Sequence, residues 1–158
     1  MELRISLINK IPQRYLPLAK AIAKRAVLYV IEDVQNNIKI NLTNRILAKR
    51  SGKLLMSWSR QPVVKDESGG TRATLSSNLV YARIHEGPDD GGEFTEIRPV
   101  RARKLRFEIE GRVIYADVVR IPARRYISLS LEATKPKVDG LANRAILDEV
   151  RKFKSGVA

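Results

Sequence analysis

The sequence LRFEIEGRVIYADVVRIPARRYISLSL, residues 105–131, decides the expected fold. Apolar and polar residues alternate over 105–109 and again over 113–115, on either side of the turn dipeptide Glu110-Gly111. Alternation with a period of two is typical of a strand that buries one face. The stretch therefore predicts a β-hairpin with one buried face.

The second half of this stretch predicts a further strand and a helix. Residues 118–121 are strand-like and lead into Pro122, which has a fixed φ and no N–H and so suits the first turn of a helix. We expect the helix over 123–133, with Tyr126, Leu129 and Ala133 on one side. The remaining elements are expected to pack against this unit.

Towards the N-terminus the pattern changes from strand to helix. Alternating apolar residues over 3–7 predict a short strand. From Pro17 apolar residues recur at helical spacing as far as Ile38 or Ile40, which predicts the longest helix of the chain. Its basic residues Lys20, Lys24 and Arg25 lie mainly away from the apolar stripe.

The middle of the chain predicts two strands. A strand is expected from Leu54 through Trp58 towards Val64, then a hairpin loop at 66–70 and a returning strand over 71–77. On that strand Ala73 and Leu75 should share a face.

A short helix and a loop follow. Asn78 resembles a helix cap, and the helix should cover residues 79–86 and end at Gly87-Pro88. Residues 88–99 form the most loop-like segment, made acidic by Asp89, Asp90, Glu93 and Glu96. It is interpreted either as a docking element for a basic neighbour or as a surface loop.

The C-terminal region should contain a second helix. Pro136 and Gly140 argue against one uninterrupted helix, and helical spacing returns over 141–153. The predicted fold is α+β, with a long N-terminal helix and C-terminal helices packed on an antiparallel, twisted sheet of about four to five strands. We expect a single domain over 1–135, followed by a C-terminal helix and flexible tail over 136–158.

Composition bounds the class of protein. The 158 residues are 44% hydrophobic and 30% charged, as in globular chains. No apolar run approaches the ~20 residues of a membrane-spanning helix, and no signal-peptide pattern opens the sequence. Cysteine is absent, which excludes disulfides and thiol catalysis and removes the usual zinc ligands. The sequence fits a reducing cytoplasm.

The net charge of +13 is unevenly distributed. Residues 1–60 contain twelve basic and three acidic residues, a net charge of +9, whereas residues 61–158 have a net charge of +4. Such a field attracts polyanions, either nucleic acid or the acidic face of a protein. Lys20, Lys24 and Arg25 are therefore candidate DNA-facing residues, with plain solvation of a basic face as the alternative.

Residues for catalysis are few. His85 is the only histidine and lacks the second histidine of a zinc-protease motif, so it is interpreted as a packing or interface residue. Glu108 and Glu110 share a strand face and are a candidate carboxylate pair for a hydrolase, although Arg106 and Arg112 lie beside them for pairing. We predict no enzyme activity, no catalytic or metal-binding residues and no cofactor.

Four segments carry a resemblance to a known family. IPARRYISLSLE at 121–132 resembles the "IPARP(F/Y)…LS" signature of the Mu-like phage virion morphogenesis family, the tail-completion or neck proteins of tailed bacteriophages. SGKLLMSW at 51–58, SSNLVYARIHEG at 76–87 and IRP…KLRF over 97–107 follow the family's order. Arg125 departs from the pattern, since it stands where the family usually has proline.

The resemblance implies a structural virion protein of the head–tail connection. It would form a ring, most simply a hexamer, between head and tail, through which the DNA passes. Its partners would be head-side connector and tail-side terminator or tube proteins, and it would be found in the virion and, during assembly, in the host cytoplasm. The predicted interface residues are Tyr81, His85, Asp89, Asp90, Glu93, Ile121, Pro122, Arg124, Arg125 and Tyr126. The acidic loop beside the basic residues of 98–106 could support head-to-tail contacts between copies.

Three alternatives stay open from the sequence. A free basic nucleic-acid-binding module would bind duplexes with a steep salt dependence. A tail terminator that caps the tail tube would share the family resemblance. A small hydrolase would depend on Glu108 and Glu110.

Overall fold

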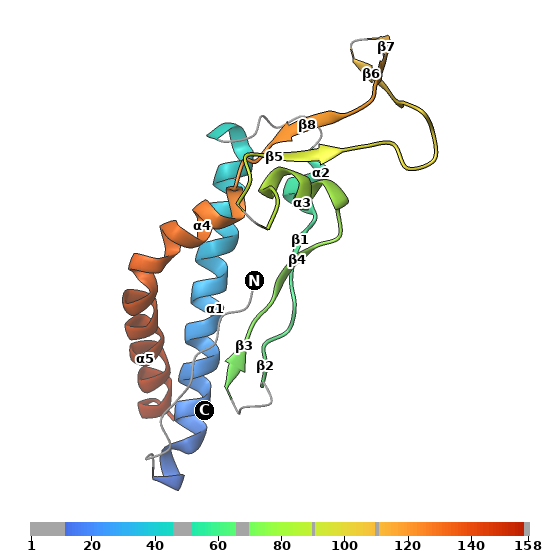
Figure 1. Ribbon diagram of the computed structural model, residues 1–158. Helices are drawn as coiled ribbons and strands as arrows, with labels where there is room; N and C mark the ends of the chain where they lie inside the picture. Colours follow the sequence, from blue (N-terminus) through green and yellow to red (C-terminus); the bar gives the residue numbers. More distant parts are fainter. Residues whose placement is uncertain (1–11, 46–51, 66–69, 90, 110, 157–158) are drawn as a thin grey trace. The chain divides into compact units, whose positions relative to one another are not determined.

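A computed structural model describes residues 12–45, 52–65, 70–89, 91–109 and 111–156 (Figure 1). The chain forms two compact units: residues 1–78 together with 127–158, and residues 79–126. The strand expected over 3–7 and the two acidic residues Asp90 and Glu110 lie outside the described residues. None of the described helices is both long and apolar enough to cross a bilayer.

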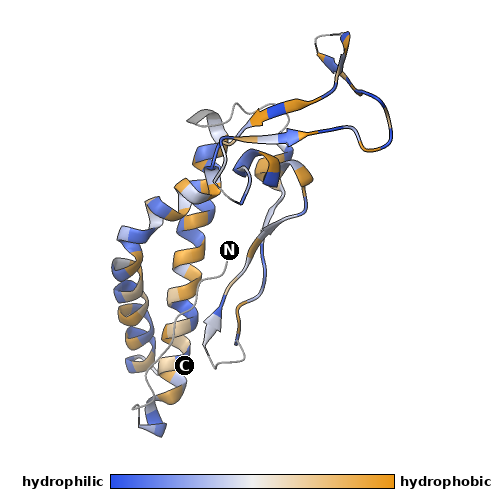
Figure 2. Cartoon of the chain, viewed as in Figure 1, coloured by the Kyte–Doolittle hydropathy of each residue, from blue (hydrophilic) through white to orange (hydrophobic). Residues whose placement is uncertain are grey.

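The first unit is built on the long predicted helix, which is confirmed. Helix α1 spans Leu16–Ile40, follows the short 3-10 helix η1 at Gln13–Tyr15 and continues into a π-helical turn, η2, at Asn41–Arg45. Hydrophobic positions recur along α1 (Figure 2). Its buried residues are Ala19, Ala23, Ala26, Val27, Val30, Ile31, Val34 and Ile38. This apolar face holds most of the core of the unit.

The C-terminal helices pack on α1. Helix α4 (Tyr126–Thr134), the 3-10 turn η3 (Lys135–Lys137) and helix α5 (Val138–Lys154) follow one another directly. The break at Pro136 is confirmed as η3, but Gly140 lies inside α5 and does not interrupt it. A helical glycine costs only about 1 kcal/mol relative to alanine, and packing of α5 against α1 offsets that cost.

Polar contacts fix α5 against α1 near the buried Ala145. Arg25 donates from Nε to Glu149 Oε1 at 2.8 Å, and the Tyr29 hydroxyl donates to Asp148 Oδ2 at 2.6 Å. Hydrogen bonds stabilise the charged form of a carboxylate. Those from Lys152 and Arg25 lower the pKa of Glu149, and that from Tyr29 lowers the pKa of Asp148. Residues 138–154 thus belong to the same compact unit as α1.

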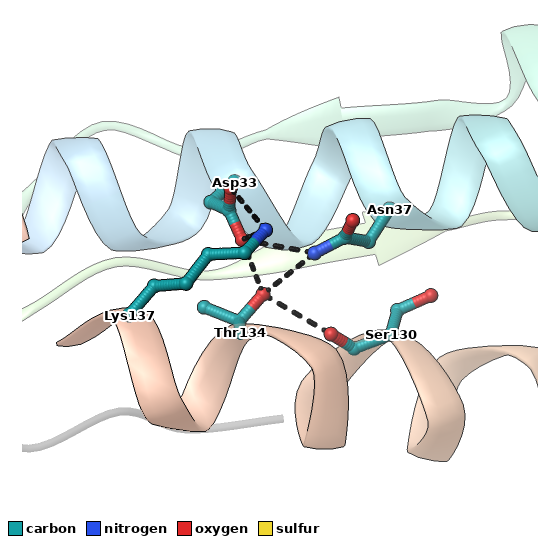
Figure 3. A network of polar contacts seen from close by, with 5 residues as sticks. All are labelled: Asp33, Asn37, Ser130, Thr134 and Lys137. Atoms are coloured by element: carbon teal, nitrogen blue, oxygen red, sulfur yellow. Dashed lines mark hydrogen bonds and ion pairs between the residues drawn. The ribbon is translucent and has the colours of Figure 1, made fainter.

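A row of polar side chains joins α1 to α4 and η3 (Figure 3). The buried Thr134 hydroxyl donates to Asp33 Oδ2 at 2.8 Å and accepts from Asn37 Nδ2 at 2.9 Å. Lys137 Nζ lies 3.1 Å from both carboxylate oxygens of Asp33. Partial burial alone would raise the pKa of Asp33, but the hydrogen bonds from Thr134, Lys137 and Asn37 together lower it.

The same row continues towards the end of α1. Asn41, which is 4% exposed, donates from Nδ2 to Ser130 Oγ at 2.8 Å, and Ser130 is fully buried. A buried polar pair stabilises only the helix alignment that satisfies it, because every other alignment leaves donors and acceptors without partners. The row therefore sets the register of α4 along α1.

Short strands complete the first unit. Strand β1 (Trp58–Arg60) pairs antiparallel with β4 (Leu75–Ser77), and β2 (Val64–Lys65) pairs with β3 (Thr71–Arg72). Ala73 and Leu75, which were predicted to share a face, are both buried, at 3% and 6% exposure.

The predicted start of the first strand is wrong. Residues Lys53–Met56 form a helical turn, α2, after Gly52 at φ 70°. Four residues of the pattern KLLM are too few to separate a period of two from a helical period. The left-handed Gly52 then starts a helical turn instead of an extended strand.

The second unit contains helix α3 (Val80–Glu86) and four strands. Strand β5 (Phe94–Ile97) pairs antiparallel with β8 (Val119–Pro122), and β6 (Leu105–Ile109) pairs with β7 (Arg112–Ala116). The predicted hairpin and the turn at Gly111, with φ 77°, are confirmed. The segment expected as a loop over 88–99 contains β5.

Two predicted helix starts in this unit are wrong. Leu79 occupies the cap position of α3 in an extended conformation, so Asn78 is not its cap. Pro122 is the last residue of β8, and α4 begins only at Tyr126. The N–H of Ala123 extends the strand pairing by donating to the Glu93 carbonyl at 2.8 Å, so it is not available to a helix.

The mixed α+β class is confirmed, with its long N-terminal helix, C-terminal helices and antiparallel strands. The strands nevertheless pair as four two-stranded sheets, not as one sheet of four to five strands. Alternation in a sequence reports which residues share a face but not how many neighbours each strand has.

Candidate functional site

Two segments that carry the family resemblance meet in the second unit. The main-chain N–H groups of Arg124 and Arg125 donate to the His85 carbonyl, at 2.7 and 3.3 Å. The fully buried Tyr126 donates its hydroxyl to the Ala82 carbonyl at 3.2 Å. Segment 121–126 is therefore held against the C-terminal half of α3. We refer to this contact as the α3 junction.

Glycine at position 87 is needed for the α3 junction. Gly87 has φ 105°, which side-chain-bearing residues rarely adopt, and a Cβ there would lie 2.5 Å from the Cβ of Ala123. Arg125 also has a positive φ, 49°, and its guanidinium donates to the Gly91 carbonyl. Chain reversal after α3 and close approach of segment 121–126 thus depend on two unusual backbone conformations.

His85 is half-buried in the α3 junction. Its carbonyl receives the two N–H bonds, whereas its buried Nδ1 has no hydrogen-bond partner among the described residues. Burial, and secondly the positive charge of Arg124, lower the pKa of His85, so its imidazole is neutral at pH 7. No group of three or more acidic, histidine or cysteine side chains in the described parts of the chain is arranged to hold a metal ion.

The other predicted interface residues of this unit differ in exposure. Tyr81 and Ile121 are half-buried, whereas Pro122, Arg124 and Arg125 are exposed. Through their main-chain groups, His85, Arg124 and Arg125 hold their own unit together. An interface role for their side chains stays a prediction.

Arginines of the same unit pair with much of the acidic segment. Arg83 lies 2.7 Å from Asp89, and Glu96 accepts hydrogen bonds from Arg120 at 2.8 Å and Arg98 at 2.9 Å. Both bonds lower the pKa of Glu96, and the bond from Arg120 contributes more than the bond from Arg98. Glu93 is exposed, and its carbonyl accepts the Ala123 N–H. The sequence places these charges near one another but does not show which of them pair.

The candidate DNA-facing residues of α1 differ in their exposure and in their pairing. Lys20 and Lys24 are exposed, whereas Arg25 is engaged with Glu149, whose hydrogen bond is the main reason that the pKa of Arg25 is raised. Helical spacing alone placed all three away from the apolar stripe. The acidic partner of Arg25 on α5 is 124 positions away in the sequence.

The hairpin β6–β7 is the least buried apolar element of the second unit. Opposed residues of an antiparallel pair share a face, and the register places Leu105 opposite Ala116 and Phe107 opposite Ile114. Ile109 and Ile114 are 51% and 38% exposed, and the other members are only half-buried. We call these five residues the hairpin apolar face. The prediction that the hairpin buries one face is therefore wrong within this single chain.

The carboxylate pair considered for hydrolysis is not supported as a site. Glu108 is exposed on β6, opposite Val113 and on the face away from Phe107, and Glu110 lies outside the described residues. An exposed carboxylate on a two-stranded hairpin is not enclosed in a cleft of the kind in which small-molecule sites lie.

Comparisons with protein-family models, curated proteins and solved structures each found no match. The family resemblance thus depends on the four sequence segments alone. Two of these segments form the α3 junction.

Proposed function

We propose that this protein is a structural component of the head–tail connection of a tailed bacteriophage, a neck or tail-completion protein that acts as a ring of identical copies. The observation that carries the proposal is the hairpin apolar face. A two-stranded hairpin is marginally stable in water unless it packs on another element. A second copy, or a neighbouring ring protein, would supply the missing cover.

The sequence resemblance supports the phage assignment, and the exposed face supports assembly. In a head-to-tail ring each copy offers one surface and receives another, so a hairpin with one apolar face needs only a single complementary surface on the next copy. The proposed ring is a hexamer located in the virion at the head–tail interface, with host cytoplasm as the site of assembly. The proposed role is non-catalytic.

The mass of the protein in solution tests this proposal. Light scattering after size exclusion should give a ring-sized species, about 107 kDa for six copies of the 17.9 kDa chain, or a monomer that forms rings on addition of a head or tail partner. Ile114→Glu, which places a charge on the hairpin apolar face, should abolish that species. Val100→Glu is the matched control, because Val100 is 95% exposed and lies outside the hairpin.

Two outcomes would contradict the proposal. A wild-type protein that stays monomeric at every salt concentration and with each candidate partner has no ring to form. A ring that survives Ile114→Glu does not use the hairpin apolar face. Addition of head-side or tail-side proteins separately distinguishes a neck protein from a tail terminator.

A further inference from the structure

The segment that leads into the hairpin is strongly basic, and ring formation does not explain its charge. We define the basic arm as residues 98–116, the segment before β6 together with β6 and β7. It contains six basic residues and two acidic ones, a net charge of +4 in 19 residues. The two basic and two acidic residues of 105–116 cancel, so the net charge comes from the four basic residues before β6: Arg98, Arg101, Arg103 and Lys104.

The cations of the basic arm are not all equally available. Arg98 pairs with Glu96 at 2.9 Å, and Lys104 lies 4.0 Å from Asp117. Arg101, Arg103 and Arg106 are exposed, and in the described part of the chain no ion pair involves them. Three guanidinium groups within six positions are thus open to an external anion.

The strand register separates Arg106 from the hairpin apolar face. Arg106 lies opposite Tyr115 on the face of the hairpin that is opposite to Phe107 and Ile114. Arg106 therefore stays open when the hairpin apolar face is covered by protein, whereas Arg112, opposite Ile109, lies on the covered side.

We propose that Arg101, Arg103 and Arg106 bind the phosphate backbone of double-stranded DNA. Guanidinium groups form paired hydrogen bonds with phosphate oxygens, and exposed cations release counterions from the duplex when they bind it. Contacts to phosphates carry no base information, so binding is independent of sequence.

Double-stranded DNA is favoured over a single strand. Single-strand sites combine cations with several aromatic side chains on which successive bases stack. Among the described residues of the basic arm, one large aromatic side chain, that of Tyr115, is exposed, at 61%. DNA binding by these arginines requires only one copy of the chain, so it can be measured independently of ring formation.

The test measures binding of a fluorescein-labelled 20-base-pair duplex by fluorescence anisotropy between 50 and 300 mM NaCl. The triple variant Arg101→Ala, Arg103→Ala, Arg106→Ala is compared with Lys39→Ala, Lys135→Ala, Lys154→Ala, which removes the same charge from exposed positions of the first unit. The log–log salt slope of the arm variant should be shallower by about 2.7, or 0.9 per lost phosphate contact. Its affinity at 0.1 M salt should be about 500-fold lower.

The lysine control should keep a slope within about one unit of the wild type, because its residues would make no phosphate contact. Equal losses in both triple variants would mean bulk attraction to net charge and would overturn the site. Absence of duplex binding by the wild type at 50 mM NaCl, or tighter binding of a 20-nucleotide dT strand, would overturn it as well. Light scattering without DNA reports ring formation separately, and the arm variant should keep the wild-type mass.

Discussion

The polar row between α1 and α4 can be tested by Thr134→Val. Valine has nearly the shape of threonine but lacks the hydroxyl that donates to Asp33 at 2.8 Å and accepts from Asn37 at 2.9 Å. Thr134 is 2% exposed, so water cannot replace the lost partner. One charge-assisted bond is worth about 1.5–3 kcal/mol and one neutral bond about 0.5–1.5 kcal/mol. We expect the free energy of unfolding to fall by about 2–4 kcal/mol.

The assay is urea unfolding followed by the fluorescence of Trp58, the single tryptophan of the chain. Trp58 lies in β1 of the first unit, so its signal reports the unit that contains the polar row. With a urea dependence of about 2 kcal/mol per molar, the midpoint should fall by about 1–2 M. Thr43→Val is the control, because the exposed Thr43 hydroxyl bonds only local carbonyls and water can replace it.

A midpoint change as small as that of the control would refute the reasoning. It would mean that the hydroxyl of Thr134 contributes nothing beyond what valine supplies by packing. The pair Asp33→Asn and Thr134→Val should also be non-additive by about 1 kcal/mol or more, since both remove the same bond.

Three further predictions concern both units. The pKa of Asp33 is lowered in the folded state, so its contribution to stability is present above pH ~4 and is lost as the pH falls through the folded pKa. Asp33→Asn should therefore make the urea midpoint, followed by the fluorescence of Trp58, fall less steeply between pH 6 and 3. Gly87→Ala should destabilise the second unit by about 3 kcal/mol or more, because Gly87 has a positive φ and an added Cβ would meet Ala123. Mass spectrometry should show faster amide exchange in this unit, and Ala123→Gly should partly restore the slower exchange. Tyr126→Phe should cost about 1 kcal/mol in the same exchange assay, and unchanged exchange would show that its bond to Ala82 is dispensable.

Periodicity predicted the elements in which one pattern extends over many residues. Helix α1 keeps its apolar stripe over about seven turns, so a helical period cannot be confused there with the period of a strand. The hairpin is marked by alternation on both sides of a turn. By contrast, residues 53–56 contain too few positions to fix a period, and the start of that helical turn is decided by Gly52. The number of strands that pair with each strand could not be predicted either, because alternation shows only which residues share a face. Each described strand has one partner.

The candidate sites were predictable only in part. The sequence marks Lys20, Lys24 and Arg25 alike, yet only the fold brings Glu149 to Arg25. The charge block at 98–106 was visible in the sequence, but its importance depends on which cations are already paired. Pairing between residues far apart in the chain is a tertiary property, and local pattern does not contain it.

The departure from the family signature at position 125 can be understood from the backbone of the α3 junction. Proline fixes φ near −65° and has no N–H, whereas Arg125 has φ 49° and its N–H donates to the His85 carbonyl at 3.3 Å. A chain with proline at position 125 would have to enter α4 by a different backbone path. The features that do not depend on position 125 are the Gly87–Ala123 approach and the Tyr126–Ala82 bond.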